Sequence, residues 1–156
     1  MSREIHFNEE HIINFHEEIE QEEILIKLAE FLYDKGYVKK TFLKSILKRE
    51  SENPTGLHTG DINVAIPHTE TKHVNDDAIA IAVLENPVLF AQMDQPSNMI
   101  DVNIVIMLAL TDPNKHIEIL QRVINLVQNQ DLLKKVLENS YDRKFIESVF
   151  TKQLMK

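Results

Sequence analysis

Two long apolar runs in the middle of the chain constrain the fold more than any other feature of the sequence. Residues 78–84 and 100–110 are rich in β-branched side chains and carry few charges, which is the pattern of strands covered on both faces. A shorter run over residues 62–66 alternates large and small side chains and ends at Pro67, which cannot donate to a strand ladder. We therefore expect strands in the middle of the chain.

Helical periodicity is clear on both sides of these strands. Residues 20–35 place apolar side chains at helical spacing before Gly36, and a second helix is expected over residues 38–49. After the strands, Asp112 is expected to cap a helix whose first position is Pro113. Shorter helices are expected over residues 131–137 and 141–154. Helices, strands and then helices again predict an α/β layered domain.

Length and composition exclude several classes of protein. The 156 residues fit a single domain, and a net charge of −8 argues against nucleic-acid partners. The chain has no cysteine, which excludes disulfides, thiol nucleophiles and Cys-ligated zinc and is natural for a cytoplasmic protein. A membrane span needs about 20 apolar residues, and no run here approaches that length, so we expect no direct membrane insertion. Three glycines leave no phosphate-cradling loop for a nucleotide cofactor.

His68 is the first candidate for chemistry. It follows the strand expected over residues 62–66, and sites in open α/β sheets gather just beyond the carboxyl ends of strands. No apolar residue follows it directly, so we expect its ring to be accessible. The alternative interpretation is a histidine of a surface loop with no function.

Arg49 and His116 are the other two candidates. Arg49 ends the second expected helix, where it either complements the helix dipole or holds phosphate oxygens with its planar fork. A return of the chain after residue 49 could bring it close to His68. His116 lies in the first turn of the helix capped by Asp112, where it is either a core histidine or a donor to a phosphoryl group.

The remaining histidines give weaker signals. His6, His11 and His16 recur every five residues, which would place them on different faces of a helix. His68 and His73 are four residues apart, but the intervening residues do not match the H-E-x-x-H zinc motif. We therefore expect no metal site.

Three short segments resemble a known family. They are Arg49-Glu50, Pro-Thr-Gly-Leu over residues 54–57, and Val-Ala-Ile-Pro-His over residues 64–68. Together they resemble the "RE…PTG…AIPH" signature of the enzyme IIA domains of the bacterial sugar phosphotransferase system, fructose–mannitol class. Further segments look like the galactitol-type branch: residues 67–70, 73–74, 86–93 and 105–110. The resemblance covers most of the chain, from about residue 20 to about residue 150.

The resemblance implies a role for each candidate. It makes His68 the phosphorylated histidine and Arg49 the phosphate-stabilising arginine. His116 resembles the second active-site histidine of mannitol and fructose members, whereas galactitol-type members often carry another polar residue there. Asn63 stands where many members have glycine, and asparagine tolerates left-handed backbone angles better than most residues, so we expect the turn to survive.

The resemblance also implies a fold and a phosphoryl relay. The expected fold is a mixed β-sheet flanked by helices on both faces, formed as a single enzyme IIA domain over residues 1–156. HPr would phosphorylate His68, which would pass the group to a cysteine of enzyme IIB for uptake of a sugar or hexitol through the membrane enzyme IIC. Without cysteine or a membrane segment, this chain is expected to use IIB and IIC on separate chains and to need no cofactor. We expect an apolar ring around His68 to dock both partners.

Two other functions are consistent with parts of this pattern. A regulatory phosphoprotein of a phosphotransferase branch not coupled to transport would carry the same phosphohistidine. A histidine-rich metal-binding module would use His68 and His73. The galactitol-like segments favour the transport relay over the regulatory phosphoprotein, and the metal-binding module is the weakest of the three interpretations.

Overall fold

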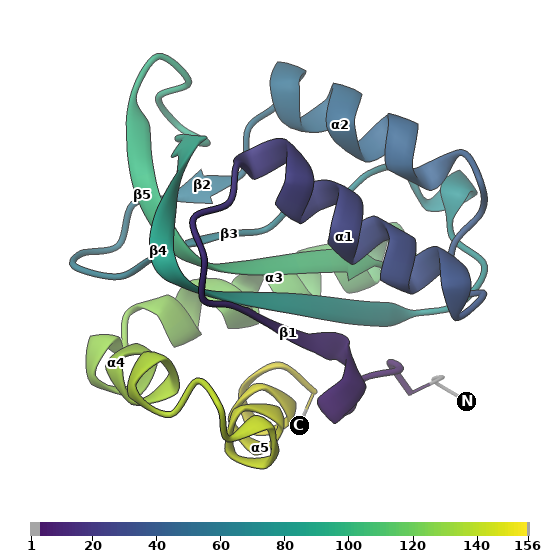
Figure 1. Ribbon diagram of the computed structural model, residues 1–156. Helices are drawn as coiled ribbons and strands as arrows, with labels where there is room; N and C mark the ends of the chain where they lie inside the picture. The colour runs from purple at the N-terminus through teal and green to yellow at the C-terminus, as the bar shows by residue number, and fades with distance from the viewer. Residues whose placement is uncertain (1–3, 156) are drawn as a thin grey trace.

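One mixed five-stranded sheet organises the computed structural model, which describes residues 4–155 (Figure 1). The strand order is β1-β4-β5-β3-β2, with β1/β4 and β3/β5 parallel and β4/β5 and β2/β3 antiparallel. The strands are β1 (Ile12–Phe15), β2 (Gly56–Leu57), β3 (Asn63–Ala65), β4 (Ala78–Ala91) and β5 (Met99–Ala109).

Helices cover both faces of this sheet (Figure 1), which confirms the expected fold class. Two helices pack on one face: α1 (Gln21–Asp34) and α2 (Phe42–Glu52). Three helices pack on the other: α3 (Pro113–Val127), α4 (Gln130–Glu138) and α5 (Arg143–Met155). Two short 3-10 turns, η1 (Glu9–His11) and η2 (Thr71–His73), complete the elements. No helix in the described part of the chain combines the length and apolar character needed to cross a membrane.

The central strand β4 shows how the sequence divides the core. Its first residues alternate between alanine and larger side chains, and successive side chains of a strand point to opposite faces. Ala78, Ala80 and Ala82 face the α1–α2 layer, whereas Ile79 and Ile81 face the α3–α5 layer. The small side chains let α1 lie close to the sheet, and the large ones fill the space under the other layer.

Four of the strands and helices differ from the sequence prediction, and one of them is the two-residue β2, where no strand was predicted. β1 was not predicted, because its four residues lie between acidic segments without a clear alternating pattern. α2 begins at Phe42 instead of residue 38, because Val38 forms a β-bridge with Val74. β4 extends beyond residue 84 to Ala91, with a register shift that accommodates its proline-containing middle.

Asn63 does not adopt the left-handed conformation that we considered for it. It lies in β3, and no non-glycine residue of the described chain has a positive φ. Its side chain instead bridges two backbone groups, accepting a hydrogen bond from Thr59 N (2.9 Å) and donating one to the carbonyl of Asp101 (2.9 Å). The positive φ of this loop belongs to Gly60, at 140°.

The sheet topology places two loops at one edge. Because β3 and β5 are parallel, the segment after β3 and the loop that leads from β5 into α3 leave the sheet at the same end. A backbone hydrogen bond from Leu108 N to the carbonyl of Pro67 (3.0 Å) ties them together there.

Candidate functional site

A pocket of about 380 Å³ opens at this edge of the sheet. Its walls come from the end of α2, the segment after β3 and the first turn of α3. The lining residues are Arg49, His68, Thr69, Glu70, Thr71, Pro113 and His116. The three residues singled out in the sequence therefore lie in one pocket, although they come from three separate segments.

His68 is half-buried in this pocket with one ring nitrogen fixed. Its Nδ1 lies 2.8 Å from the carbonyl oxygen of Ile66, and because a carbonyl only accepts, Nδ1 carries the proton. The other nitrogen, Nε2, then keeps its lone pair. Burial lowers the pKa of the His68 ring, the positive charge of Arg49 lowers it further, and the bond to Ile66 opposes both. The ring is therefore neutral and nucleophilic near pH 7.

His116 lies beside His68, with 5.2 Å between the ring centroids. Burial lowers the pKa of His116 to about 4, together with repulsion from a protonated His68 ring and from Arg49, against a smaller opposite effect of Asp77. Its Nε2 is buried and has no hydrogen-bond partner among the described residues. A neutral ring with an unpaired nitrogen can bond to a ligand without first losing a protein partner.

A buried carboxylate fixes the start of α3. Asp77 is 1% exposed and accepts hydrogen bonds from Thr111 N (2.7 Å), Thr111 Oγ1 (2.9 Å) and Lys115 Nζ (2.6 Å). Burial alone would raise the pKa of Asp77, but these bonds outweigh it and hold the pKa below its ordinary value. Asp112 caps the same turn by accepting from Asn114 N. His116, next to Lys115 in the chain, is thereby held in place.

Arg49 lies in the last turn of α2 with an exposed side chain. Within residues 4–155, no carboxylate forms an ion pair with its guanidinium. Its five N–H donors remain available to oxygen atoms of a ligand in the pocket, and a guanidinium can hold two such oxygens at once. The pocket therefore combines a neutral nucleophilic ring, a second neutral ring and a permanent cation.

Glu50, the next residue along α2, is 6% exposed and points away from the pocket. Its carboxylate accepts from Thr55 N (2.8 Å) and Thr55 Oγ1 (2.7 Å). Burial raises the pKa of Glu50 to about 7, although the two bonds from Thr55 act in the opposite direction. This contact joins the end of α2 to the loop that leads into β2.

Gly56, after Thr55, allows this loop to approach the sheet closely. A Cβ atom at this position would lie 2.7 Å from the carbonyl oxygen of Ala91, which is backbone and cannot move aside easily. The P-T-G segment therefore supports the structure of the site, whereas Arg49 faces the pocket.

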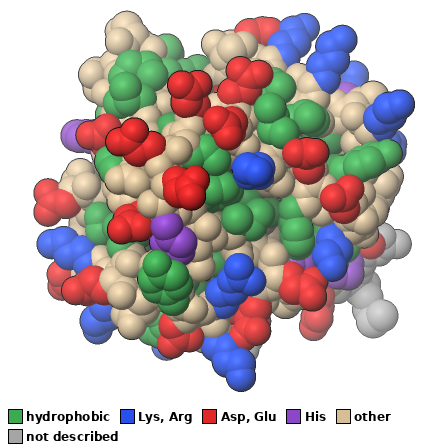
Figure 2. Space-filling model, in the orientation of Figure 1, with side chains coloured by type: hydrophobic (Ala, Val, Ile, Leu, Met, Phe, Trp, Pro, Cys, Tyr) green, Lys and Arg blue, Asp and Glu red, His purple; other side chains and the backbone are tan. Residues whose placement is uncertain are grey.

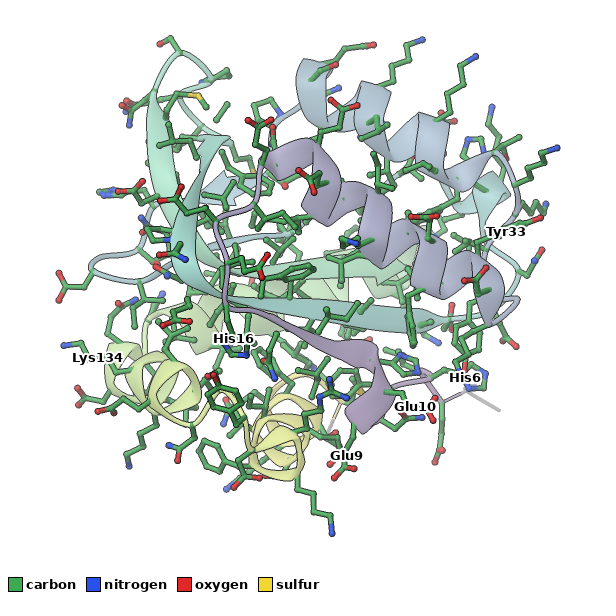
Figure 3. The ribbon with its side chains drawn as sticks, viewed as in Figure 1. His6, Glu9, Glu10, His16, Tyr33 and Lys134 are labelled. Carbon is green, nitrogen blue, oxygen red and sulfur yellow. The ribbon has the colours of Figure 1, made fainter. Side chains whose placement is uncertain are left out.

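Of the N-terminal histidines, His6 and His16 lie far apart (Figure 3). His6 stacks on Tyr37, with 4.7 Å between the centroids, and His16 stacks on Tyr141, with 4.4 Å. His11 is buried and donates from Nδ1 to the carbonyl of Ile79. His11 also contacts Tyr37, with 5.6 Å between the ring centroids, so His6 and His11 share this neighbour and His16 does not.

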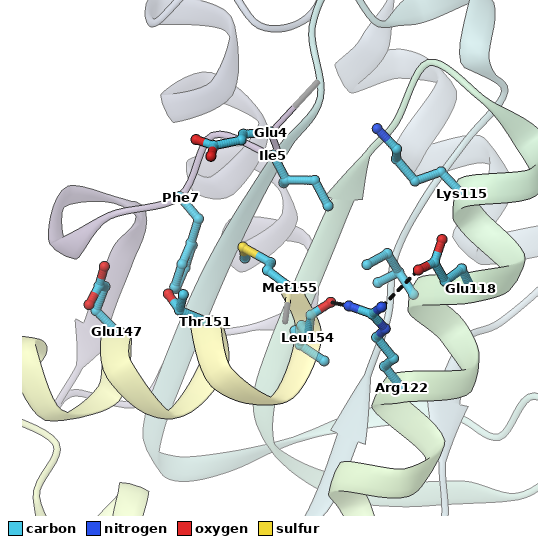
Figure 4. Close-up of a pocket in the computed structure, with 11 residues that line it drawn as sticks. Glu4, Ile5, Phe7, Lys115, Glu118, Arg122, Glu147, Thr151, Leu154 and Met155 are labelled. Atoms are coloured by element: carbon cyan, nitrogen blue, oxygen red, sulfur yellow. Dashed lines mark hydrogen bonds and ion pairs between the residues drawn. The ribbon is translucent and has the colours of Figure 1, made fainter. Parts of the chain in front are cut away.

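A second, larger pocket lies between the N-terminal segment, α3 and α5 (Figure 4). It has a volume of about 560 Å³ and contains none of the three candidate residues. Its arginine, Arg122, donates to the carbonyl of Leu154 (2.7 Å) and to Glu118 (2.8 Å). Its lysine, Lys115, is bonded to Asp77. The cations of this pocket are thus already paired within the protein.

Sequence reasoning missed two residues that support the site, Asp77 and Glu50. Asp77 is an acidic residue directly before the apolar run over residues 78–84, which is a signal for a buried carboxylate at a strand end. Glu50 and Thr55 both belong to the segments that resemble the family signature, but neither was predicted to have a role, and nothing local in the sequence indicates that they are in contact.

Comparison with known proteins gives consistent results for family and fold. The family described as "Phosphoenolpyruvate-dependent sugar phosphotransferase system, EIIA 2" matches residues 5–152. The galactitol-specific EIIA component of Escherichia coli K12 is 29% identical over 119 residues, which cover 76% of this chain and 79% of that protein.

Two solved structures from Escherichia coli share the fold. The IIA mannitol crystal structure has a TM-score of 0.74 at 20% identity and covers 92% of this chain and 98% of that one. A complex of enzyme IIA and phosphorylated enzyme IIB for mannitol has a TM-score of 0.73 at 18% identity and covers 92% and 96% of the two chains.

Replacing Glu50 by Gln tests its role in holding the loop. The amide nitrogen would face one of the two Thr55 donors, and an unsatisfied buried donor costs about 1–3 kcal/mol. We expect Glu50→Gln to lower the free energy of unfolding in urea by that amount at about pH 5, where Glu50 is neutral in the folded protein because its pKa is raised to about 7. Glu52→Gln, at an exposed position in the same helix turn, should have little effect. Equal stability of the two variants would contradict the role.

The lowered pKa of His116 predicts a pH dependence of stability. The pKa of His116 is 6.5 in the unfolded chain and about 4 in the folded protein. Above pH 6.5 the ring is neutral in both states, and its full contribution to the free energy of unfolding is present there. That contribution is lost as the pH falls from 6.5 to about 4. His68 and His11 also have lowered pKa values, so the wild type must be compared with His116→Gln.

Between pH 6.5 and about 4, we expect the free energy of unfolding of wild type to fall by about 1–3 kcal/mol more than that of His116→Gln, as measured by urea unfolding. His58→Gln, at an exposed loop position, should follow the wild type. Parallel curves for wild type and His116→Gln would show that His116 is not held neutral by the fold.

Proposed function

We propose that His68 is the phosphorylated residue of this chain, which belongs to the EIIA 2 family of the phosphoenolpyruvate-dependent sugar phosphotransferase system. The members of this family are phosphotransferases that act through a phosphohistidine. The single observation that carries this assignment is the hydrogen bond from His68 Nδ1 to the carbonyl of Ile66. It leaves Nε2 with a free lone pair inside a pocket that also holds Arg49 and His116.

In the proposed first step, Nε2 of His68 attacks the phosphorus of phosphorylated HPr. A P–N bond forms to Nε2 while the donor's P–N bond breaks, and that electron pair returns to the donor's ring. The proton on Nδ1 stays in place, because the Ile66 carbonyl holds it. Phosphoryl transfer needs mainly positioning and charge stabilisation from the protein, and no metal or nucleotide takes part in this scheme.

Arg49 and His116 would stabilise the oxygens of the transferring group. The Arg49 guanidinium supplies a permanent positive charge at the mouth of the pocket. His116 would donate a hydrogen bond as a neutral ring. A dianionic phosphoryl group beside His116 would also favour its charged form, so the ring can gain a proton as the phosphohistidine forms.

The second step would pass the group to enzyme IIB. A thiolate of IIB attacks phosphorus, the P–Nε2 bond breaks, and the electron pair returns to His68. The 156 residues contain no cysteine, so the acceptor thiolate would come from IIB, and IIC would act after it. The sequence similarity to galactitol-specific EIIA supports a hexitol or related sugar as the transported substrate. We propose that the chain forms a single domain that acts in the cytoplasm.

Intact-protein mass after incubation with phosphoenolpyruvate, enzyme I and HPr tests the assignment of His68. We expect wild type to gain one acid-labile phosphoryl group and His68→Ala to gain none while keeping its fold. His73→Ala, at the neighbouring histidine, is the control and should be phosphorylated normally. A phosphorylated His68→Ala protein would disprove the assignment.

Adding enzyme IIB to the phosphorylated protein separates transport from regulation. Loss of the added mass, with its appearance on IIB, supports the transport relay. A stable phosphohistidine that IIB does not remove would favour a regulatory phosphoprotein.

Arg49→Lys tests the proposed use of the guanidinium. Lysine keeps the positive charge but cannot hold two phosphoryl oxygens in one plane. We expect the transfer rate at saturating phosphorylated HPr to fall about tenfold or more, which corresponds to at least about 1.4 kcal/mol of transition-state stabilisation. Lys48→Arg, one residue earlier on the exposed side of α2, is the control and should leave the rate unchanged. A wild-type rate in Arg49→Lys would leave Arg49 with a purely electrostatic role.

A further inference from the structure

The two helices that flank the pocket present different chemistry to a docking partner. The α2 side carries what we term the cationic face: Lys40, Lys44, Lys48 and Arg49, all exposed. The α3 side carries Pro113 and Ile117, and Ile117 is 69% exposed although it is apolar. The surface around His68 is thus not the uniform apolar ring that we expected from the sequence.

The cationic face stands out in a chain of net charge −8. Residues 39–49 contain five of the 17 Lys and Arg side chains and no Asp or Glu. Figure 2 shows Lys and Arg side chains along the edge above α2, and acidic and basic side chains interspersed over the rest of the face in view. The cationic face is therefore a local cluster on a surface of mixed charge.

Few carboxylates neutralise the cationic face. Lys48 has one weak contact, 4.0 Å to Glu52, and its side chain is 76% exposed. Within residues 4–155, no ion pair involves Lys40, Lys44 or Arg49. Lys44 and Lys48 are spaced by four residues, which aligns their side chains along one side of α2, and Lys40 lies just before this helix. The row ends beside Arg49, and Arg49 lines the pocket.

A protein that reaches His68 must cover the end of α2, because Arg49 and His68 line the same pocket. An acidic protein would be repelled by the net negative charge of the chain and attracted at the cationic face. Charged residues at the rim of an interface mainly set the association rate and the orientation, whereas the apolar contact adds burial. The surface therefore fits a partner with acidic side chains on one side of an apolar centre.

We propose that the cationic face of α2 docks an acidic rim of enzyme IIB, while Ile117 on α3 packs against the apolar part of the same partner. This inference rests on the proposed function, in which IIB takes the phosphoryl group from His68. It adds the chemistry of the partner and the orientation in which it docks. A negatively charged membrane surface is the competing occupant of the cationic face.

Charge reversal on α2 tests this docking. The variant is Lys44→Glu with Lys48→Glu, and the matched control is Lys27→Glu with Lys144→Glu, which makes the same charge change at exposed positions of α1 and α5. Each protein is phosphorylated with HPr and then mixed with purified IIB from the same organism in a rapid-quench instrument. Circular dichroism and urea unfolding check that both variants remain folded.

We expect the second-order rate constant for transfer to IIB to fall about tenfold or more below that of the control at about 20 mM salt. The difference should shrink to less than about twofold at about 0.5 M salt, where the screening length is only a few ångströms. The rate at saturating IIB should not change, because neither lysine lines the pocket.

Equal rates for the variant and the control at low salt would overturn the proposal. A defect that persists at high salt and at saturating IIB would also overturn it, since it would show damage to the site instead of the docking step. Loss of flotation with phosphatidylglycerol vesicles, together with unchanged transfer to IIB, would assign the cationic face to a membrane surface. If wild type itself accepts no phosphoryl group, the proposed function fails; if wild type and the variant transfer equally, only the docking inference fails.

Discussion

Parallel pairing of β3 with β5 is the constraint on which the site depends. The register pairs Val64 with Ile104 and Ala65 with Val105, so both strands run toward the same edge of the sheet. His68 follows one strand by three residues, and α3 starts a few residues after the other. Two histidines far apart in the chain therefore meet with 5.2 Å between their rings. An antiparallel pairing would place the loops at opposite edges.

The neighbours Arg49 and Glu50 have opposite environments because a helix turns by about 100° per residue. Glu50 points inward and is fixed by two hydrogen bonds from Thr55, whereas Arg49 points toward the pocket. The buried contact ties the end of α2 to the loop that leads into β2, while Arg49, the preceding residue of the same turn, lines the pocket. A structural residue thus adjoins the functional candidate, and the P-T-G loop serves the site without touching the ligand space.

Most of the fold was predictable from local patterns, and the contacts between distant segments were not. The apolar runs identified β3, β4 and β5, and Asp112 with Pro113 marked the start of α3. β1 was missed because four residues carry too little pattern, and the start of α2 was misplaced because Val38 pairs with Val74 across the fold. The bonds of Asp77 to Thr111 and Lys115 span more than 30 residues, and no local periodicity reports such a contact.

Burial and charge act together to keep the two site histidines neutral. Desolvation lowers the pKa of each ring, and the cation at Arg49 adds to it, so neither ring competes for a proton at neutral pH. A neutral His68 retains the lone pair that the proposed transfer needs. The same cation that disfavours protonation of the empty site would attract an incoming phosphoryl dianion. Arg49 would therefore favour both the unprotonated nucleophile before transfer and the charged phosphohistidine after it, which a neutral residue at that position could not do.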